Sequence, residues 1–177
     1  NVGANTPAGI LNITATDTVD LTGTGVVTWN SLTVNNAGTI TQSLASNDLR
    51  INSGTLTNSG TYDFTTDRGI TFSSISGIFD NTGTMVKSGG ASSTIQITTN
   101  QIGGSIDLLS GNLLFIQGGS FSGTNTINDT AGSLGLIGGV YAVADGTILQ
   151  DLSTAPGNLN VSASTLNIEG GLSMGAL

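Results

Sequence analysis

Residues 49–62 have the sequence Leu49-Arg-Ile-Asn-Ser-Gly-Thr-Leu-Thr-Asn-Ser-Gly-Thr-Tyr62 and contain one motif twice: Asn, any residue, Gly, Thr and an apolar residue. Gly and Asn tolerate the positive φ of tight turns, whereas Thr and apolar residues favour strands. The motif is therefore typical of a chain corner followed by a strand. Two further copies occur at Asn36–Ile40 and Asn81–Met85. We interpret the chain as short strands joined by sharp corners.

The corner glycines recur at a nearly regular spacing along the chain: Gly38, Gly60, Gly83, Gly104, Gly123, Gly146 and Gly170. A second series consists of paired apolar residues that flank one variable residue, and it recurs with nearly the same average step: Leu11/Ile13, Leu32/Val34, Leu49/Ile51, Ile70/Phe72, Ile95/Ile97, Leu113/Phe115, Leu134/Leu136 and Leu159/Val161. A period of about 22 residues, built from short strands, is typical of one turn of a parallel β-helix.

The predicted fold is therefore all-β, with a single parallel β-helix (β-solenoid) domain over residues 1–177. It should have about eight coils of roughly 22 residues each. Leu49, Ile70, Ile95 and Leu113 should stack as inward aliphatic ladders, at the strand spacing of about 4.8 Å. The amides of Asn36, Asn58 and Asn81 should form a second, structural ladder at the corners.

Two other architectures share part of this pattern. A leucine-rich repeat has a similar period, but it needs a helix or a comparable turn in each repeat, and the chain contains no convincing helical stretch. A β-sandwich is also rich in strands, but it normally shows less internal repetition. The repeat therefore favours the solenoid over both.

The composition restricts the function. The chain has 11 acidic and 3 basic residues, a net charge of −8, and no His or Cys. Arg50, Arg68 and Lys87 cannot make the basic patch that nucleic acids require. Disulfides, zinc knuckles and thiol or imidazole chemistry are excluded as well. No apolar run reaches the roughly 18 residues of a membrane span, so this segment should not insert into a membrane.

The segments Leu49–Tyr62 and Leu32-Thr-Val-Asn-Asn-Ala-Gly-Thr-Ile40 resemble the repeats of bacterial autotransporter passengers and filamentous-haemagglutinin-like adhesins. The similarity is one of repeat style and extends from about Leu11 to Leu172. It implies a right-handed β-helix, export, and a role at the cell surface or in an extracellular matrix. The secretion-domain signature and the membrane barrel of these families do not occur in this sequence, so the export route stays open.

Parallel β-helices also include polysaccharide lyases and hydrolases, which makes the acidic clusters Asp17/Asp20 and Asp63/Asp67 candidates for catalysis. Glycoside hydrolysis needs two carboxylates about 5–9 Å apart. Asp63 and Asp67 are too far apart along an ideal strand unless a corner lies between them. We interpret both clusters as solvated carboxylates.

We interpret the remaining candidate sites as features of the fold. The calcium-binding pattern Gly-Gly-x-Gly-x-Asp is absent, and the five Gly-Gly pairs fit corners better. Thr39, Thr61, Thr84 and Thr147 should form one outward row interrupted by Ser105, which is ordinary for strands and too irregular for ice binding. The sequons at Asn12, Asn128 and Asn160 are expected by chance in a chain rich in Asn and Thr. Trp29, Tyr62 and Tyr141 should pack in the core or at corners.

The sequence thus predicts no enzyme and no catalytic, cofactor-binding or metal-binding residue. The expected function is that of a secreted, extracellular rod, spacer or filament module of a bacterial surface protein or adhesin. The alternative is a carbohydrate-binding or carbohydrate-active β-helix of the tailspike or lyase type. Expected partners are neighbouring coils of a longer chain or copies of itself, with host or matrix glycans as further candidates. The apolar residues 166–177 should abut another coil, whereas Asn1–Ala8, with Pro7, should be a better blocked end.

Overall fold

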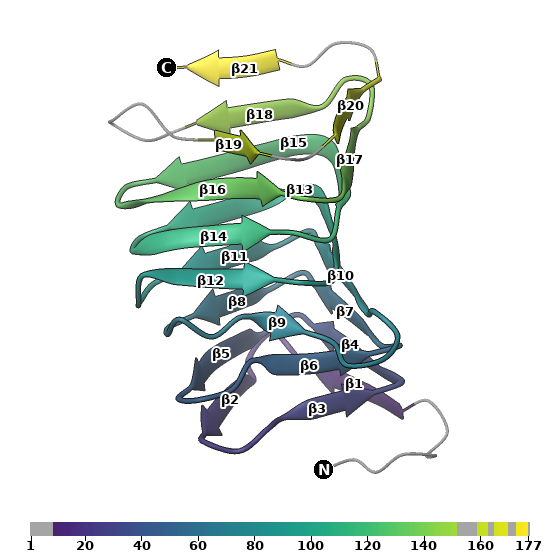
Figure 1. Cartoon of the computed structure of the whole chain (residues 1–177), viewed down its shortest axis with the longest axis vertical. Coiled ribbons are helices and arrows are strands. Elements are labelled where there is room, and N and C mark those ends of the chain that lie inside the picture. The colour runs from purple at the N-terminus through teal and green to yellow at the C-terminus, as the bar shows by residue number, and fades with distance from the viewer. Residues whose placement is uncertain (1–8, 152–158, 163–164, 170–172, 177) are drawn as a thin grey trace.

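The computed structural model describes residues 9–151, 159–162, 165–169 and 173–176 (Figure 1). Every regular element in these residues is a strand, and every pairing between named strands is parallel. The described residues include no helix that could cross a membrane. The predicted parallel β-solenoid is therefore confirmed.

Each coil contributes strands to three stacks that run along the long axis of the molecule (Figure 1). The first stack consists of β1 (Gly9–Ile13), β4 (Leu32–Asn36), β7 (Thr55–Asn58), β10 (Ile78–Asn81), the first parts of β13 (Thr98–Leu108) and β15 (Gly119–Asp129), β17 (Val140–Val143) and β20 (Thr165–Ile168). The second consists of β2 (Thr18–Gly23), β5 (Thr39–Leu44), β8 (Thr61–Phe64), β11 (Thr84–Lys87), the later parts of β13 and β15, β18 (Ile148–Asp151) and β21 (Ser173–Ala176).

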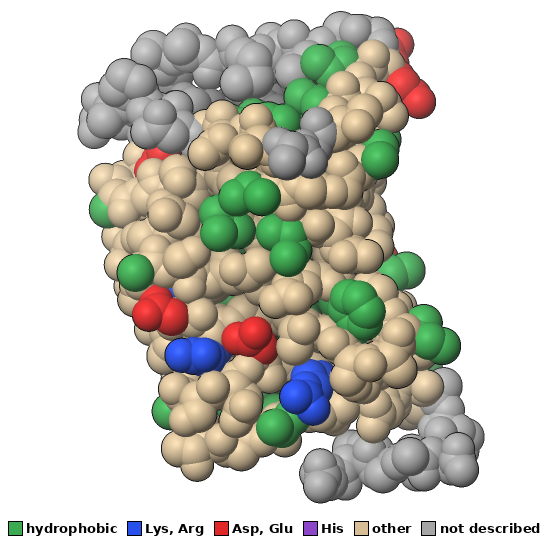
Figure 2. Space-filling model, viewed as in Figure 1, with side chains coloured by type: hydrophobic (Ala, Val, Ile, Leu, Met, Phe, Trp, Pro, Cys, Tyr) green, Lys and Arg blue, Asp and Glu red, His purple; other side chains and the backbone are tan. Residues whose placement is uncertain are grey.

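The third stack is a separate seven-stranded sheet. It consists of β3 (Thr28–Asn30), β6 (Leu49–Asn52), β9 (Ile70–Thr71), β12 (Ser92–Ile95), β14 (Gly111–Phe115), β16 (Gly132–Ile137) and β19 (Leu159–Ser162). The first two stacks form one fourteen-stranded sheet because β13 and β15 run through the corner between them. The face shown in Figure 2 is mostly uncharged, and most of its few acidic and basic side chains lie together in the lower half of the view.

The solenoid makes about seven turns, with a spacing of about 22 residues, rather than the predicted eight. The difference arises because the third stack has only seven strands in the described residues, so the last round is not closed there. The coils also lengthen toward the C-terminus, where Leu134 pairs with Leu159 and Val140 pairs with Thr165. Both of these steps are longer than the average spacing.

The core is a set of inward ladders, and one predicted ladder needs a correction. Leu49, Ile70, Ile95, Phe115 and Leu136 occupy successive coils in register and are buried.

Leu113 does not belong to this ladder, because it pairs with Ser93 below and Leu134 above. It is still buried, one inward position away. Alternating inward residues look alike in the sequence, so the apolar spacing identifies the inward face but not the register.

The first two pairs of the apolar series lie in a different stack from the others. Leu11/Ile13 and Leu32/Val34 belong to β1 and β4 of the first stack, whereas Leu49/Ile51 begins the members in the third stack. The glycine series is also only partly one column. Gly38, Gly60, Gly83 and Gly104 stack, but the next residue in register is Asn125, followed by Leu149.

The prediction that Gly123 and Gly146 continue this glycine column is therefore wrong. Gly170 lies outside the described residues. The cause is a change of corner. In β13 and β15 the chain passes through the corner as a continuous strand, and the register shifts between Ile102 and Gly104. The extra residue in β15 moves the later part of that strand out of the simple period.

Candidate functional site

The predicted amide ladder is present at the corner between the first and second stacks. Asn36 Nδ2 donates to Asn58 Oδ1 at 2.6 Å, and Asn58 Nδ2 donates to Asn81 Oδ1 at 2.6 Å. The ladder is one member longer than predicted, because Asn81 Nδ2 donates to Gln101 Oε1 at 2.9 Å. All four side chains are buried.

The ladder also satisfies backbone carbonyls at the corner, which stabilises the sharp turn. Asn36 Nδ2 donates to Thr61 O at 2.9 Å, and Asn58 Nδ2 donates to Thr84 O at 3.1 Å. The three Asn amides each donate to the next coil toward the C-terminus, so the amide oxygens of Asn58, Asn81 and Gln101 each accept a hydrogen bond from the coil before. The direction of the ladder thus leaves one acceptor open at its N-terminal end.

That open acceptor is Asn36 Oδ1, which is buried and has no hydrogen-bond partner. The residue in register below Asn36 is Ile13, whose side chain cannot donate a hydrogen bond. An unpaired buried amide oxygen costs about 1–3 kcal/mol. The first coil therefore departs from the repeat at the point where the ladder ends.

The corner of the first coil is also wider than the others. Four residues, Thr14 to Asp17, separate β1 from β2, whereas two residues separate β4 from β5. Asp17 Oδ2 closes the wider loop by accepting from Thr14 N at 2.8 Å and from Thr14 Oγ1 at 2.7 Å. These bonds lower the pKa of Asp17 below its usual value, with the Thr14 hydroxyl as the largest cause.

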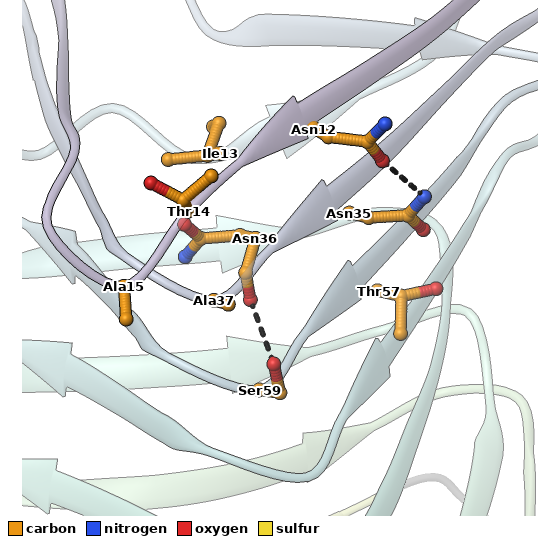
Figure 3. Close-up of a pocket in the computed structure, with 9 residues that line it drawn as sticks. All are labelled: Asn12, Ile13, Thr14, Ala15, Asn35, Asn36, Ala37, Thr57 and Ser59. Carbon is orange, nitrogen blue, oxygen red and sulfur yellow. Dashed lines mark hydrogen bonds between the residues drawn. The ribbon is translucent and has the colours of Figure 1, made fainter.

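A shallow hollow of about 380 Å³, open to solvent, lies on the outer surface at this corner (Figure 3). Nine uncharged residues line it: Asn12, Ile13, Thr14, Ala15, Asn35, Asn36, Ala37, Thr57 and Ser59. Figure 3 shows Asn12, Asn35 and Thr57 along one side, with Ala15, Ala37 and Ser59 on the other. The side chain of Asn36 points away from Asn12, Asn35 and Thr57, because Asn36 lies on the inward side of β4.

Some of the polar groups that line this hollow form hydrogen bonds with one another. Asn35 Nδ2 donates to Asn12 Oδ1 at 2.8 Å, and Ser59 Oγ donates to Asn36 O at 3.1 Å. Thr57 lies on the outward side of β7 and is half-buried. The hollow thus combines amide and hydroxyl groups with the methyl groups of two alanines, and its lining carries no charge. Such a lining suits a neutral, hydrogen-bonding ligand rather than an ion.

The sequence predicted the ladder but not the hollow. The sequence signal for the hollow is the segment Ile13-Thr-Ala-Thr-Asp17, which replaces the corner motif and contains neither its Asn nor its Gly.

Some carboxylates of the two acidic clusters accept hydrogen bonds from backbone N–H groups. Asp67 Oδ1 accepts from Ser92 N at 3.1 Å and from Ala91 N, and these bonds lower the pKa of Asp67. Asp63 lies on the outward side of β8 and accepts from Ser88 Oγ at 2.8 Å, while Asp20 lies on the outward side of β2. The described residues contain no group of three or more acidic side chains that could hold a metal ion.

Lys87 is a buried cation that the sequence did not single out as a core residue. It lies in register with Phe64 and Leu108 on the inward side, and its exposed fraction is 0%. Its Nζ donates to Thr66 O at 2.9 Å and to Gly89 O. Burial lowers the pKa of Lys87, and the charges of Asp67 and Asp63 oppose this shift.

The predicted outward hydroxyl row exists with different members. Thr18, Thr39, Thr61, Thr84, Ser105 and Thr126 are in register on the second stack. Thr147 does not belong to the row, because it is buried and donates to Ala144 O at 2.7 Å. The neighbouring outward row mixes Asp20, Thr41, Asp63, Val86, Asp107 and Asn128, so the face is not a uniform threonine array.

The predicted packing of the large aromatic residues is confirmed. Trp29, Tyr62 and Tyr141 are all buried. The sequon residues lie on outward faces, where Asn12 is exposed and Asn128 Nδ2 donates to Asp107 Oδ1 at 2.6 Å.

Comparisons of the chain with protein-family models, curated proteins and solved structures found no match. The likeness to autotransporter passengers and haemagglutinin-like adhesins is therefore one of repeat style. The chain is identified by its fold, which is a parallel β-solenoid.

Proposed function

We propose that this chain is a rod or spacer module of an extracellular bacterial surface protein, and that its coils continue by stacking on further coils. The observation that carries the proposal is the unbroken parallel pairing in all three stacks. Continuous strand pairing along one axis resists bending and exposes few strand edges to proteases.

The ends of the described solenoid support stacking. β1, β2 and β3 at one end, and β19, β20 and β21 at the other, each pair with a described strand on one side only. Inward apolar residues are partly exposed there: Leu11 by 38%, Val161 by 40% and Ile168 by 46%. Three parallel strands at one end match three at the other, so a second copy could extend the solenoid head to tail.

Association can be tested by sedimentation velocity over a concentration series. The predicted result is a mass that grows with concentration and a Val161→Lys variant that stays monomeric, because a lysine on the inward side places a charge against the next coil. Asn160→Lys is the matched control, because Asn160 neighbours Val161 in β19 but is exposed on the outward side. It should associate like the wild type.

A chain that remains monomeric at every concentration would contradict stacking between copies. So would an equal loss of association in both variants, since that would report a general effect of charge. The residues at 170–172 and 177, on which part of the prediction for 166–177 rests, lie outside the described residues, as do Asn1–Ala8.

A further inference from the structure

We infer that copies of this chain stack in one defined register, in which β20 of one copy lies against β1 of the next copy and Asn167 pairs with Asn12. The inference rests on the proposed stacking of coils and adds the residues that select the register. Its basis is a column of outward side chains on the first stack, whose two ends are complementary. β1 and β20 lie toward opposite ends of the solenoid (Figure 1).

The outward column that begins at Asn12 is polar on every coil but one. Its hydrogen bonds run in one direction, because the later coil donates in each. Asn35 Nδ2 donates to Asn12 Oδ1 at 2.8 Å. Asn100 Nδ2 donates to Asp80 Oδ1 at 2.8 Å, and Ser120 Oγ donates to Asn100 Oδ1 at 2.9 Å. In register, the column consists of Asn12, Asn35, Thr57, Asp80, Asn100, Ser120, Ala142 and Asn167.

The two ends of this column carry complementary groups. At one end Asn12 is exposed; its Oδ1 accepts from Asn35, and its Nδ2 lies on the side away from Asn35 (Figure 3). At the other end Asn167 is exposed, and its neighbour in the coil before is Ala142, whose side chain forms no hydrogen bonds. When the column continues from one copy into the next, Asn12 Nδ2 donates to Asn167 Oδ1, in the same direction as the bonds within the chain.

The same register also continues the inward apolar columns. Leu166 and Ile168 of β20 then meet Leu11 and Ile13 of β1, as Leu11 meets Val34 within one copy. In a single copy Leu11 is exposed by 38% and Ile168 by 46%. Stacking in this register removes both side chains from water, which favours association.

Other registers lose these matches. A slip of one residue reverses the two faces, so that Asn167 falls in line with Leu11 or Ile13 and an amide enters the apolar core. A slip of two residues keeps the faces but places Asn167 beside Ile10, which has no donor, or beside Thr14, whose hydroxyl already donates to Asp17. The amide pair thus selects one register among those that apolar contact alone allows.

The first test compares the variants Asn12→Asp and Asn167→Asp by sedimentation equilibrium of the full chain. Both add the same charge at the same junction. A carboxylate at position 167 still accepts from Asn12, whereas a carboxylate at position 12 still accepts from Asn35 but cannot donate to Asn167. Loss of this one hydrogen bond should make Asn12→Asp associate about two- to tenfold more weakly than Asn167→Asp.

The second test traps the junction with a disulfide, since the chain has no native Cys. Chains carrying Asn12→Cys are mixed with chains carrying Asn167→Cys under mild oxidation, and linked peptides are identified by mass spectrometry. In-register neighbours lie about 4.8 Å apart, within the Cα range of a disulfide. Ile10→Cys is the matched control, because it lies on the same face at about 8 Å from position 167, beyond that range. The pair 12/167 should therefore link much faster than the pair 10/167.

The outcomes separate this register from the stacking on which it rests. A wild-type chain that never associates would overturn both. Association with equal weakening by the two Asp variants, or with equally fast linkage of the 10/167 and 12/167 pairs, would leave stacking intact and overturn the register alone.

Discussion

At the scale of single residues, the fold depends on positions where the coils leave no space for a side chain. Gly60 is such a position: a Cβ there would lie against Gly38 O and Ala37 C of the coil below, well inside van der Waals contact. Its φ is not in the left-handed region, so the requirement is close approach and not backbone conformation. The sequence motif showed that glycine belongs at this corner, and the structure shows that the reason is stacking.

The first prediction is that Gly60→Ala lowers the free energy of unfolding by about 1–3 kcal/mol, because the new methyl group forces two coils apart. Urea denaturation followed by circular dichroism would measure it. Gly25→Ala is the matched control, since a Cβ at Gly25 meets nothing within 4 Å. Equal stability of the two variants would show that the column is not close-packed.

The second prediction at this scale concerns Lys87 and pH. Because burial holds the pKa of Lys87 below its usual value of 10.5, the unfolded chain binds more protons than the folded chain as the pH rises toward 10.5. The wild type should therefore gain stability relative to a Lys87→Met variant as the pH is raised from neutral toward that value. Buried tyrosines are present in both proteins, so their titration cancels in the difference. Urea denaturation at a series of pH values would measure it, and parallel stability curves would contradict the prediction.

At the scale of elements, the corners are held by the amide ladder. The sequence placed Asn36, Asn58 and Asn81 at equivalent positions, since one motif recurs at a nearly constant step. It could not supply Gln101 as the fourth member, because Gln101 lacks the motif and its side chain is longer. It also could not supply the inward position of Lys87, because inward positions of adjacent strands differ only by register, and register is set by corner lengths along the whole chain.

The third prediction is that Asn58→Ala lowers the free energy of unfolding by about 3 kcal/mol, because it leaves Asn81 Oδ1 without its donor and leaves a cavity in the corner. Asn112→Ala is the control: Asn112 is exposed, and its amide oxygen accepts from Ser133 Oγ at 2.9 Å on the outer surface. That control should change stability by less than about 0.5 kcal/mol. A loss for Asn58→Ala as small as that of the control would show that the ladder does not stabilise the corners.

At the scale of the whole molecule, the described residues form a parallel β-solenoid whose coils repeat at the strand spacing. The composition predicted the all-β class, and the period predicted the solenoid. The hollow at the first corner could not be predicted, because it results from two absences, the Asn and the Gly of the motif, in a loop of ordinary polar composition. A coil that lacks the repeat motif thus has a surface that differs from the surface of the other coils.

The most direct test of the rigid solenoid is a distance between spin labels at Thr18→Cys and Thr126→Cys, measured by double electron–electron resonance. The chain has no native Cys, so the labels are unique. Thr18 and Thr126 face outward in one row, five register steps apart. A continuous stack predicts a single narrow distribution centred at about 24 Å, which is five strand spacings. A broad distribution, or one centred far from that distance, would contradict a rigid stack of parallel coils.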